Sequence, residues 1–274
     1  MLYFTKMQGL GNDFIVINNI DGDVCLSTEE IRQLADRRLG IGFDQLLMVE
    51  NSRLEGVDFR YVIFNADGSE VGQCGNGARC FARFVERNNL IEKSIIKVET
   101  ISGRLELKIN HDNTVRVNMG SPVFDPKNIP YISEITDIEY LVEGQQMGVL
   151  SIGNPHAIIH IKDINSNDIK STGTKIQGSD SFPNGVNVGF MQIVNSSEIY
   201  LRVIERGVGE TLACGSGACA AVVHGVRLGL LDEKVKVHLS GGDALVEFDG
   251  NNTYLSGPAE FVYEGAVNLR TGKI

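Results

Sequence analysis

Short runs of apolar and β-branched residues, separated by Gly, Asn and Asp, recur along the chain and predict β-strands. One run covers 59–65 and ends in a polar residue. Further along, 95–100 and 105–109 flank Ser102-Gly103, a pattern typical of a strand, a tight turn and a second strand. A third strand is expected over 114–119, so this part of the chain predicts a sheet.

The second half of the chain repeats this order. A strand is expected over 199–205, then two strands over 235–239 and 244–248 around Gly241-Gly242, and a last strand over 253–255. Matching positions in the two halves are about 140 residues apart. Because this period is far too long for a solenoid, the pattern indicates a duplicated domain.

Each half also contains a cysteine that follows a loop and precedes an apolar stretch predicted to be helical. Cys74 stands in Cys-Gly-Asn-Gly-Ala, and Cys214 stands in Cys-Gly-Ser-Gly-Ala, 140 residues later. The start of a helix offers unpaired N–H groups and a positive dipole end, which stabilise a thiolate and lower a cysteine pKa. The alternative is an inert cysteine at a tightly packed helix start. Two copies in register favour two acid/base groups that act on one substrate.

Polar residues recur at matching positions around these cysteines. The pairs, at offsets of 140 to 142, are Asn12 with Asn154, Gln45 with Asn187, and Asn65 with Glu205. Asn is common in turns for local reasons, but the set could surround a polar ligand. His156 lies at one of these repeated turns, and Glu205-Arg206 ends a strand just before the second cysteine loop. This location favours ligand contact over a solvated charge pair.

Composition narrows the function classes. The 274 residues include 35 acidic and 25 basic side chains, for a net charge of −10, so we expect no nucleic-acid partner. No apolar run approaches the roughly 20 residues of a membrane span, and the N-terminal residues do not resemble a signal peptide. The odd number of cysteines, five, indicates reduced thiols and a cytoplasmic location.

Other segments carry weaker signals. Cys80 and Cys219 are expected in the core, and no cysteine pair has the C-x-x-C spacing of a zinc ribbon or a redox motif. Short Gly-x-Gly pieces lack the dinucleotide fingerprint, so no metal and no cofactor are expected. The stretch 165–180 is expected to be a polar surface loop, and the prolines within 121–146 predict a segment between domains.

The chain resembles the diaminopimelate epimerase family along essentially its whole length. The blocks that carry the resemblance are Met-Gln-Gly-Leu-Gly-Asn-Asp-Phe at 7–14, Gly-Phe-Asp-Gln at 42–45, Phe-Asn-Ala-Asp-Gly-Ser at 64–69, the cysteine blocks at 74–79 and 213–218, Gly-Asn-Pro-His at 153–156 and Gly-Glu-Thr at 209–211. The cysteine blocks alone would also fit the related proline racemases, whereas the complete set is specific to the epimerases.

The resemblance implies an α/β (α+β) fold of two pseudo-symmetric domains. Each would be a mixed, barrel-like sheet around a central helix that begins at its cysteine, with the active site in the cleft between the domains. The N-terminal half would comprise 1–118 plus 263–274, and the C-terminal half 119–262. The resemblance also implies a homodimer with Tyr263 at its interface.

The resemblance further implies interconversion of LL- and meso-2,6-diaminopimelate, in lysine and peptidoglycan precursor biosynthesis, without pyridoxal phosphate or metal. In the LL-to-meso direction Cys214 would accept the proton and Cys74 would donate one, while His156 and Glu205 tune the thiol pKa values. The substrate-binding residues that it implies are Asn12, Gln45, Asn65, Gly75, Asn76, Asn154, Asn187, Glu205, Arg206, Gly215 and Ser216.

Three other functions remain open at this point. A proline or hydroxyproline racemase of the same fold is disfavoured by the polar residues, which a small cyclic amino acid does not need. A thiol redox protein would be expected to contain a C-x-x-C motif. A non-catalytic binding module would have no use for two reactive cysteines.

Overall fold

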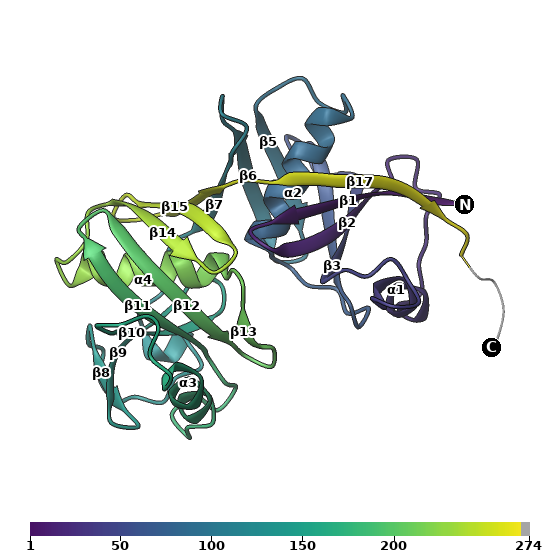
Figure 1. The fold of residues 1–274 in the computed structure, drawn as a ribbon. Coiled ribbons are helices and arrows are strands. Elements are labelled where there is room, and N and C mark those ends of the chain that lie inside the picture. Colours follow the sequence, from purple (N-terminus) through teal and green to yellow (C-terminus); the bar gives the residue numbers. More distant parts are fainter. Residues whose placement is uncertain (270–274) are drawn as a thin grey trace. The chain divides into compact units, whose positions relative to one another are not determined.

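The computed structural model describes residues 1–269, which divide into two compact units. Unit 1 contains Met1–Val117 and the chain from Gly257 onward, and unit 2 contains Asn118–Ser256. The chain rejoins unit 1 at Gly257, earlier than the expected position 263, because strand β17 (Glu260–Val267) pairs with β1 (Leu2–Gly9) (Figure 1). Within the expected 263–274 segment, residues 270–274 lie outside the described residues.

Unit 1 is a mixed sheet with two helices. Its strands after β1 are β2 (Asn12–Asn18), β3 (Gln45–Asn51), β4 (Phe59–Asn65), β5 (Ile95–Thr100), β6 (Gly103–Ile109) and β7 (Val115–Gly120). The last three residues of β7 already belong to unit 2. From β1 to β7 the successive pairings are antiparallel, parallel, antiparallel, parallel, antiparallel and antiparallel. Helix α1 (Thr28–Ala35) precedes β3, and α2 (Gly75–Arg87) precedes β5.

Unit 2 repeats this topology. Its elements are the 3₁₀ turn η1 (Pro126–Asn128), β8 (Tyr140–Val142), β9 (Gln145–Ser151), β10 (Pro155–His160), α3 (Ile169–Gln177), β11 (Asn187–Asn195), β12 (Glu198–Glu205), β13 (Gly209–Thr211), α4 (Gly215–Arg227), β14 (Lys234–Leu239), β15 (Gly242–Phe248) and β16 (Thr253–Gly257). From β9 to β16, leaving out the short β13, the pairings alternate in the same order as in unit 1. The duplication expected from the sequence is confirmed.

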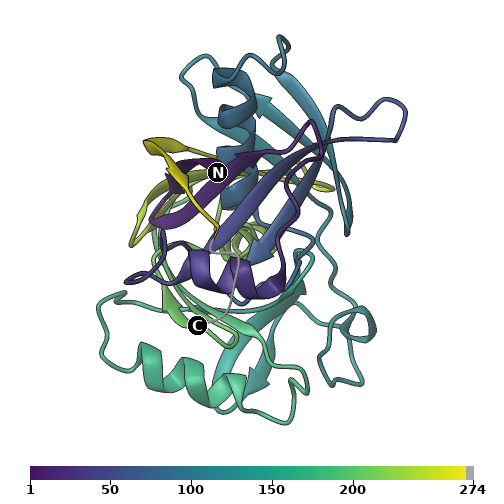
Figure 2. The same ribbon diagram turned by 90° about the vertical axis from the view of Figure 1, so that its right-hand side faces the viewer.

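Each sheet wraps around the helix that begins at its cysteine. Helix α2 packs against β1, β2, β3 and β6, and α4 packs against β9, β10, β11, β12 and β15 (Figure 2). In α4 every residue from Gly217 to Gly225 is buried, which explains why this helix is apolar on all sides. A residue in its first turn is thus held by surrounding strands.

The second face of each sheet is covered by the other helix. In unit 1, Ile31 and Leu34 of α1 pack on β2 and β3, and the Ser27–Glu30 capping box fixes the start of α1. In unit 2, α3 occupies the corresponding place, so the prediction of a polar loop over 165–180 was wrong. Ile169 and Ile176 bury one face of α3 against the sheet, but Asp168 makes no side-chain cap, so the local start signal is missing.

The structure also tests the predictions made for two other cysteines and for the proline-containing stretch. Cys80 and Cys219 are fully buried, as predicted. The proline-containing stretch 121–146 belongs entirely to unit 2 and includes η1 and β8, so it is not a linker between domains. Within residues 1–269, no helix is both long enough and apolar enough to cross a membrane.

Candidate active site

Cys74 is the N-cap residue of α2. Its sulfur accepts a hydrogen bond from the backbone N–H of Gly77 at 3.3 Å, and its carbonyl oxygen accepts the N–H of Ala78 at 2.8 Å. The thiol also lies 3.9 Å from Oδ1 of Asn12, on β2. Because the first turn of a helix directs N–H groups at this position, the predicted helix-start cysteine is confirmed for unit 1.

The neighbouring polar residues of unit 1 form two groups. Asn76, in the first turn of α2, is buried, and its Nδ2 lies 3.5 Å from Oδ1 of Asn12. Gln45 and Asn65 stand opposite one another on β3 and β4, where Nε2 of Gln45 donates to Oδ1 of Asn65 at 2.9 Å. The buried Oε1 of Gln45 accepts no hydrogen bond within the described chain. It is therefore available to a donor on a ligand.

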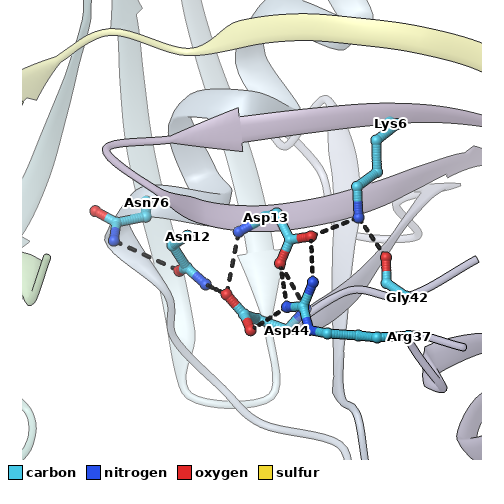
Figure 3. Close-up of polar contacts among 7 residues, drawn as sticks. All are labelled: Lys6, Asn12, Asp13, Arg37, Gly42, Asp44 and Asn76. Atoms are coloured by element: carbon cyan, nitrogen blue, oxygen red, sulfur yellow. Dashed lines mark hydrogen bonds and ion pairs between the residues drawn. The ribbon is translucent and has the colours of Figure 1, made fainter. Parts of the chain in front are cut away.

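Behind Asn12 lies an ion-pair network that the sequence analysis did not assign (Figure 3). Oδ2 of Asp44 accepts from Nδ2 of Asn12 at 2.7 Å and from the backbone N–H of Asp13 at 3.1 Å. Arg37 donates to both carboxylates, at 2.8 Å to Asp44 and at 2.7 and 3.0 Å to Asp13. Asp13 and Asp44 belong to the quoted motif blocks, and this position was the signal that could have revealed them.

Asp13 is the centre of this network. Nζ of Lys6 donates to Oδ2 of Asp13 at 2.6 Å and also to the carbonyl oxygen of Gly42. Partial burial acts to raise the pKa of Asp13, but hydrogen bonds and charges from Arg37 and Lys6 outweigh it and lower that pKa to about 2. The carboxylate therefore stays ionised and holds β1, β2 and the loop before β3 together.

Cys214 is the N-cap residue of α4 and is buried. Its carbonyl oxygen accepts the N–H of Ala218 at 2.9 Å, and its sulfur lies 3.7 Å from the hydroxyl of Ser216. Burial and the nearby charge of Glu205 raise the thiol pKa well above its ordinary value, against the opposing effects of Gly217 N–H and Ser216. The expectation that a helix start lowers the pKa is thus wrong for Cys214, because desolvation is the larger effect.

Glu205 stands at the end of β12 and accepts a hydrogen bond from the hydroxyl of Thr211, on β13. Glu205 was predicted from the sequence as a site residue, whereas Thr211, which lies in the Gly-Glu-Thr block, was not. Since Thr211 fixes the carboxylate and Glu205 acts on the pKa of Cys214, a pKa-tuning role for Glu205 is supported by its location in this unit.

His156 is fully buried on β10, and burial, aided by the charge of Arg206, lowers its pKa to about 3. The ring is therefore neutral. Nε2 lies 2.9 Å from Oδ1 of Asn154; since an amide oxygen only accepts, Nε2 carries the proton and Nδ1 is an acceptor. Nδ1 has no hydrogen-bond partner among the described residues, so it is an unsatisfied buried acceptor beside the turn at Asn154.

Asn187 and Arg206 connect the ends of β10, β11 and β12. Asn187 donates through Nδ2 to the carbonyl oxygen of Pro155 at 3.1 Å, and its Oδ1 accepts the backbone N–H of Arg206 at 2.9 Å. The guanidinium of Arg206 donates to the carbonyl oxygen of Asn184 at 2.9 Å and remains exposed. Asn187 thus positions the loop, and the exposed Arg206 is the cation of this group.

Comparison with known proteins identifies the family of this arrangement. The family model for diaminopimelate epimerase matches residues 4–124 and 148–262. A curated relative from Vesicomyosocius okutanii, named diaminopimelate epimerase, is 56% identical over 270 residues, which covers 98% of this chain and 100% of the relative. The chain belongs to the diaminopimelate epimerase family.

Solved structures show how widely the fold of this family is shared. A phenazine biosynthesis protein of the PhzF family from Bacillus anthracis superposes with a TM-score of 0.70 at 16% identity, covering 97% of this chain and 99% of that chain. A hydroxyproline epimerase from Agrobacterium vitis gives a TM-score of 0.69 at 12% identity, covering 96% and 91%. At these identities the likeness shows the fold alone, whereas the curated relative supports the epimerase family.

As a member of the diaminopimelate epimerase family, the protein is an isomerase. In unit 1, Asn12 lies beside Cys74 and Asn76 beside Asn12, while Gln45 and Asn65 form a separate pair. In unit 2, Ser216 and Glu205 act on Cys214, while His156 contacts Asn154, and Asn187 contacts the backbone of Arg206. The two surroundings differ: an amide oxygen faces Cys74, and a carboxylate influences Cys214. Tyr263 is on β17, and its ring centroid lies 6.0 Å from that of Phe4 in a T-shaped arrangement.

Proposed function

We propose that this isomerase interconverts LL- and meso-2,6-diaminopimelate by a two-base proton transfer, as a step of lysine and peptidoglycan precursor biosynthesis. The observation that carries the proposal is the 56% identity to a diaminopimelate epimerase over 98% of the chain. Two N-cap cysteines in matching units fit this chemistry, because inversion needs one group to remove a proton and another to deliver one.

In the LL-to-meso direction Cys214 is the base and Cys74 the acid, with the roles exchanged in reverse. An α-proton is a weak acid, so the developing charge needs electrostatic stabilisation. The first-turn N–H groups of α2 and α4, at Gly75, Asn76, Gly215 and Ser216, are suited to hold the α-carboxylate. Because one thiol removes the α-proton and the other delivers one, this mechanism requires both thiols to act on the same carbon atom of the bound substrate.

Glu205 links substrate binding to the activation of Cys214. Its charge raises the pKa of Cys214 in the empty enzyme. A substrate ammonium bound to Glu205 would offset this charge and so favour the thiolate. His156 is held neutral by burial, so it supplies no positive charge that would stabilise the thiolate.

The far end of the substrate carries a second ammonium and carboxylate. Arg206 supplies an exposed planar cation for the carboxylate, supported by Asn65, Asn154 and Asn187. Asn12 and Gln45 complete the polar lining. A substrate without these distal groups would leave such donors and acceptors unpaired, which gives specificity over smaller amino acids.

The remaining features of the proposal concern the state of the protein in the cell. We propose a cytoplasmic homodimer that needs no cofactor and no nucleic acid, with Tyr263 at the subunit interface. Tyr263 is 47% exposed on β17, so a partner could cover it. Light scattering should give the dimer mass for the native chain and a lower mass for Tyr263→Asp.

The direct test of the proposed activity follows α-deuterium incorporation from D₂O into LL-diaminopimelate. Deuterium should enter as meso product forms, without added cofactor, and epimerisation should be lost in Cys74→Ala and in Cys214→Ala. Cys25→Ser, at an exposed cysteine, is the matched control and should remain active. Exchange into proline but not into diaminopimelate would contradict the proposal.

A further inference from the structure

The orientation of the Asn12 amide is decided by Asp44 (Figure 3). The Asp44 carboxylate is paired with Arg37 at 2.8 Å, and an ionised carboxylate can only accept hydrogen bonds. The amide atom 2.7 Å from it must therefore be the Nδ2 of Asn12. This leaves Oδ1 as the atom that faces the sulfur of Cys74, at 3.9 Å.

An amide oxygen and an amide N–H have opposite effects on a cysteine. The oxygen accepts a hydrogen bond from a thiol and repels a thiolate, whereas an N–H stabilises the thiolate. We infer that Asp44 is a positioning residue, which fixes the amide of Asn12 with its oxygen toward Cys74 and so favours the thiol form of this cysteine. Asn76 supports the same orientation, because its Nδ2 lies 3.5 Å from the same oxygen.

The helix start at Cys74 acts in the opposite direction to the amide oxygen of Asn12. The N–H of Gly77 and the dipole of α2 favour the thiolate. Tyr61, on β4, donates its hydroxyl to the carbonyl oxygen of Cys74 at 3.5 Å. Burial raises the pKa values of Tyr61 and Cys80, so both are neutral near pH 7.

The charged groups of the network around Asp44 sum to zero. Two cations, Lys6 and Arg37, are paired with two carboxylates, Asp13 and Asp44. Removal of Asp44 would leave this network with a net charge of +1, so the test has to separate the effect of charge from that of the amide direction.

Unit 2 has no equivalent device. At the offset of 142 residues, Val186 stands in the place of Asp44, and Pro155 in the place of Asp13. The oxygen of Asn154, the counterpart of Asn12, is engaged with Nε2 of His156 instead. The arrangement therefore distinguishes the two cysteines, and its catalytic meaning, a protonated donor at Cys74, rests on the function proposed above.

The test measures the titration of Cys74 without substrate, so its result does not depend on the proposed activity. Iodoacetamide modification of the Cys74 peptide is followed by mass spectrometry as a function of pH. In Asp44→Ala the amide of Asn12 can turn, and the midpoint should fall by about one pH unit, a tenfold change in proton affinity.

A double-variant comparison separates orientation from charge. If Asp44 acts through Asn12, Asn12→Ala with Asp44→Ala should titrate like Asn12→Ala alone. An unchanged midpoint in Asp44→Ala, or an Asp44 effect that persists without Asn12, would overturn the inference. Asp44→Ser serves as a second variant if circular dichroism shows that Asp44→Ala does not fold. If the native chain showed no epimerase activity, the proposed function would be refuted, but the result of this titration would still stand.

Discussion

His224 gives the protein a buried group whose protonation should weaken unit 2 in mild acid. The side chain, on α4, is 1% exposed, and its ring packs so closely on β9 that a Cβ at Gly148 would lie 2.2 Å from Nδ1. Neither ring nitrogen has a hydrogen-bond partner within the described chain, and the nearest carboxylate oxygen, on Glu139, lies 3.8 Å away. Burial, with the charges of Arg227 and His160, lowers the pKa of His224 to about 4.

The sign and size of the effect follow from linkage. An unfolded histidine titrates near pH 6.5, so below that pH the unfolded chain binds a proton that folded His224 does not. The stabilisation from keeping His224 neutral is therefore complete above pH 6.5 and is lost as the pH falls toward about 4. Between pH 7.5 and pH 5.0 the loss amounts to about 2 kcal/mol.

His224→Leu removes this titration without breaking a side-chain hydrogen bond, since neither ring nitrogen makes one within residues 1–269. The assay is hydrogen–deuterium exchange of α4 peptides at pH 7.5 and pH 5.0, corrected for intrinsic exchange, because the two units can open separately. Other titrating groups, including His156, are common to both proteins and cancel in the comparison. The acid-induced loss in the opening free energy of α4 should be about 2 kcal/mol smaller in the variant than in the native chain. Equal losses in the two proteins would refute the argument.

Three other predictions concern single contacts. Glu205→Gln should lower the pKa of Cys214, because the Glu205 charge helps to raise it, and alkylation of the Cys214 peptide should then begin at lower pH; an unshifted profile would argue against this coupling. Gly77→Ala should lower the free energy of unfolding by about 1–3 kcal/mol, because the added Cβ would lie 2.4 Å from the hydroxyl of Tyr61. Tyr61→Phe in the same chain should restore most of the melting temperature, whereas strictly additive effects of the two substitutions would contradict the clash. Ser27→Ala should lower the free energy of unfolding, measured with denaturant, by about 1 kcal/mol, because it removes the cap of α1. Ser27→Asp, which keeps a capping side chain, should preserve this stability.

Local sequence patterns predicted helices and strands correctly where the residues that determine them lie within a few positions of one another. The paired strands around Gly103 and Gly242 were correctly placed from their turns. Helix α3 was missed, because its start has no side-chain cap and only its contacts with the sheet reveal it. Propensity is a weak guide where burial against another element decides the structure.

The sequence by itself determined the duplication, the order of the strands that flank each central helix and the cysteine at the start of that helix, because these depend on residue order and short-range geometry. Only the tertiary structure decided how each cysteine is tuned. The Asp44–Asn12 contact joins residues 32 positions apart, and the pKa of Cys214 depends on burial by surrounding strands and on Glu205. Desolvation and side-chain pairing arise from contacts between distant segments, and no local pattern in the chain encodes them.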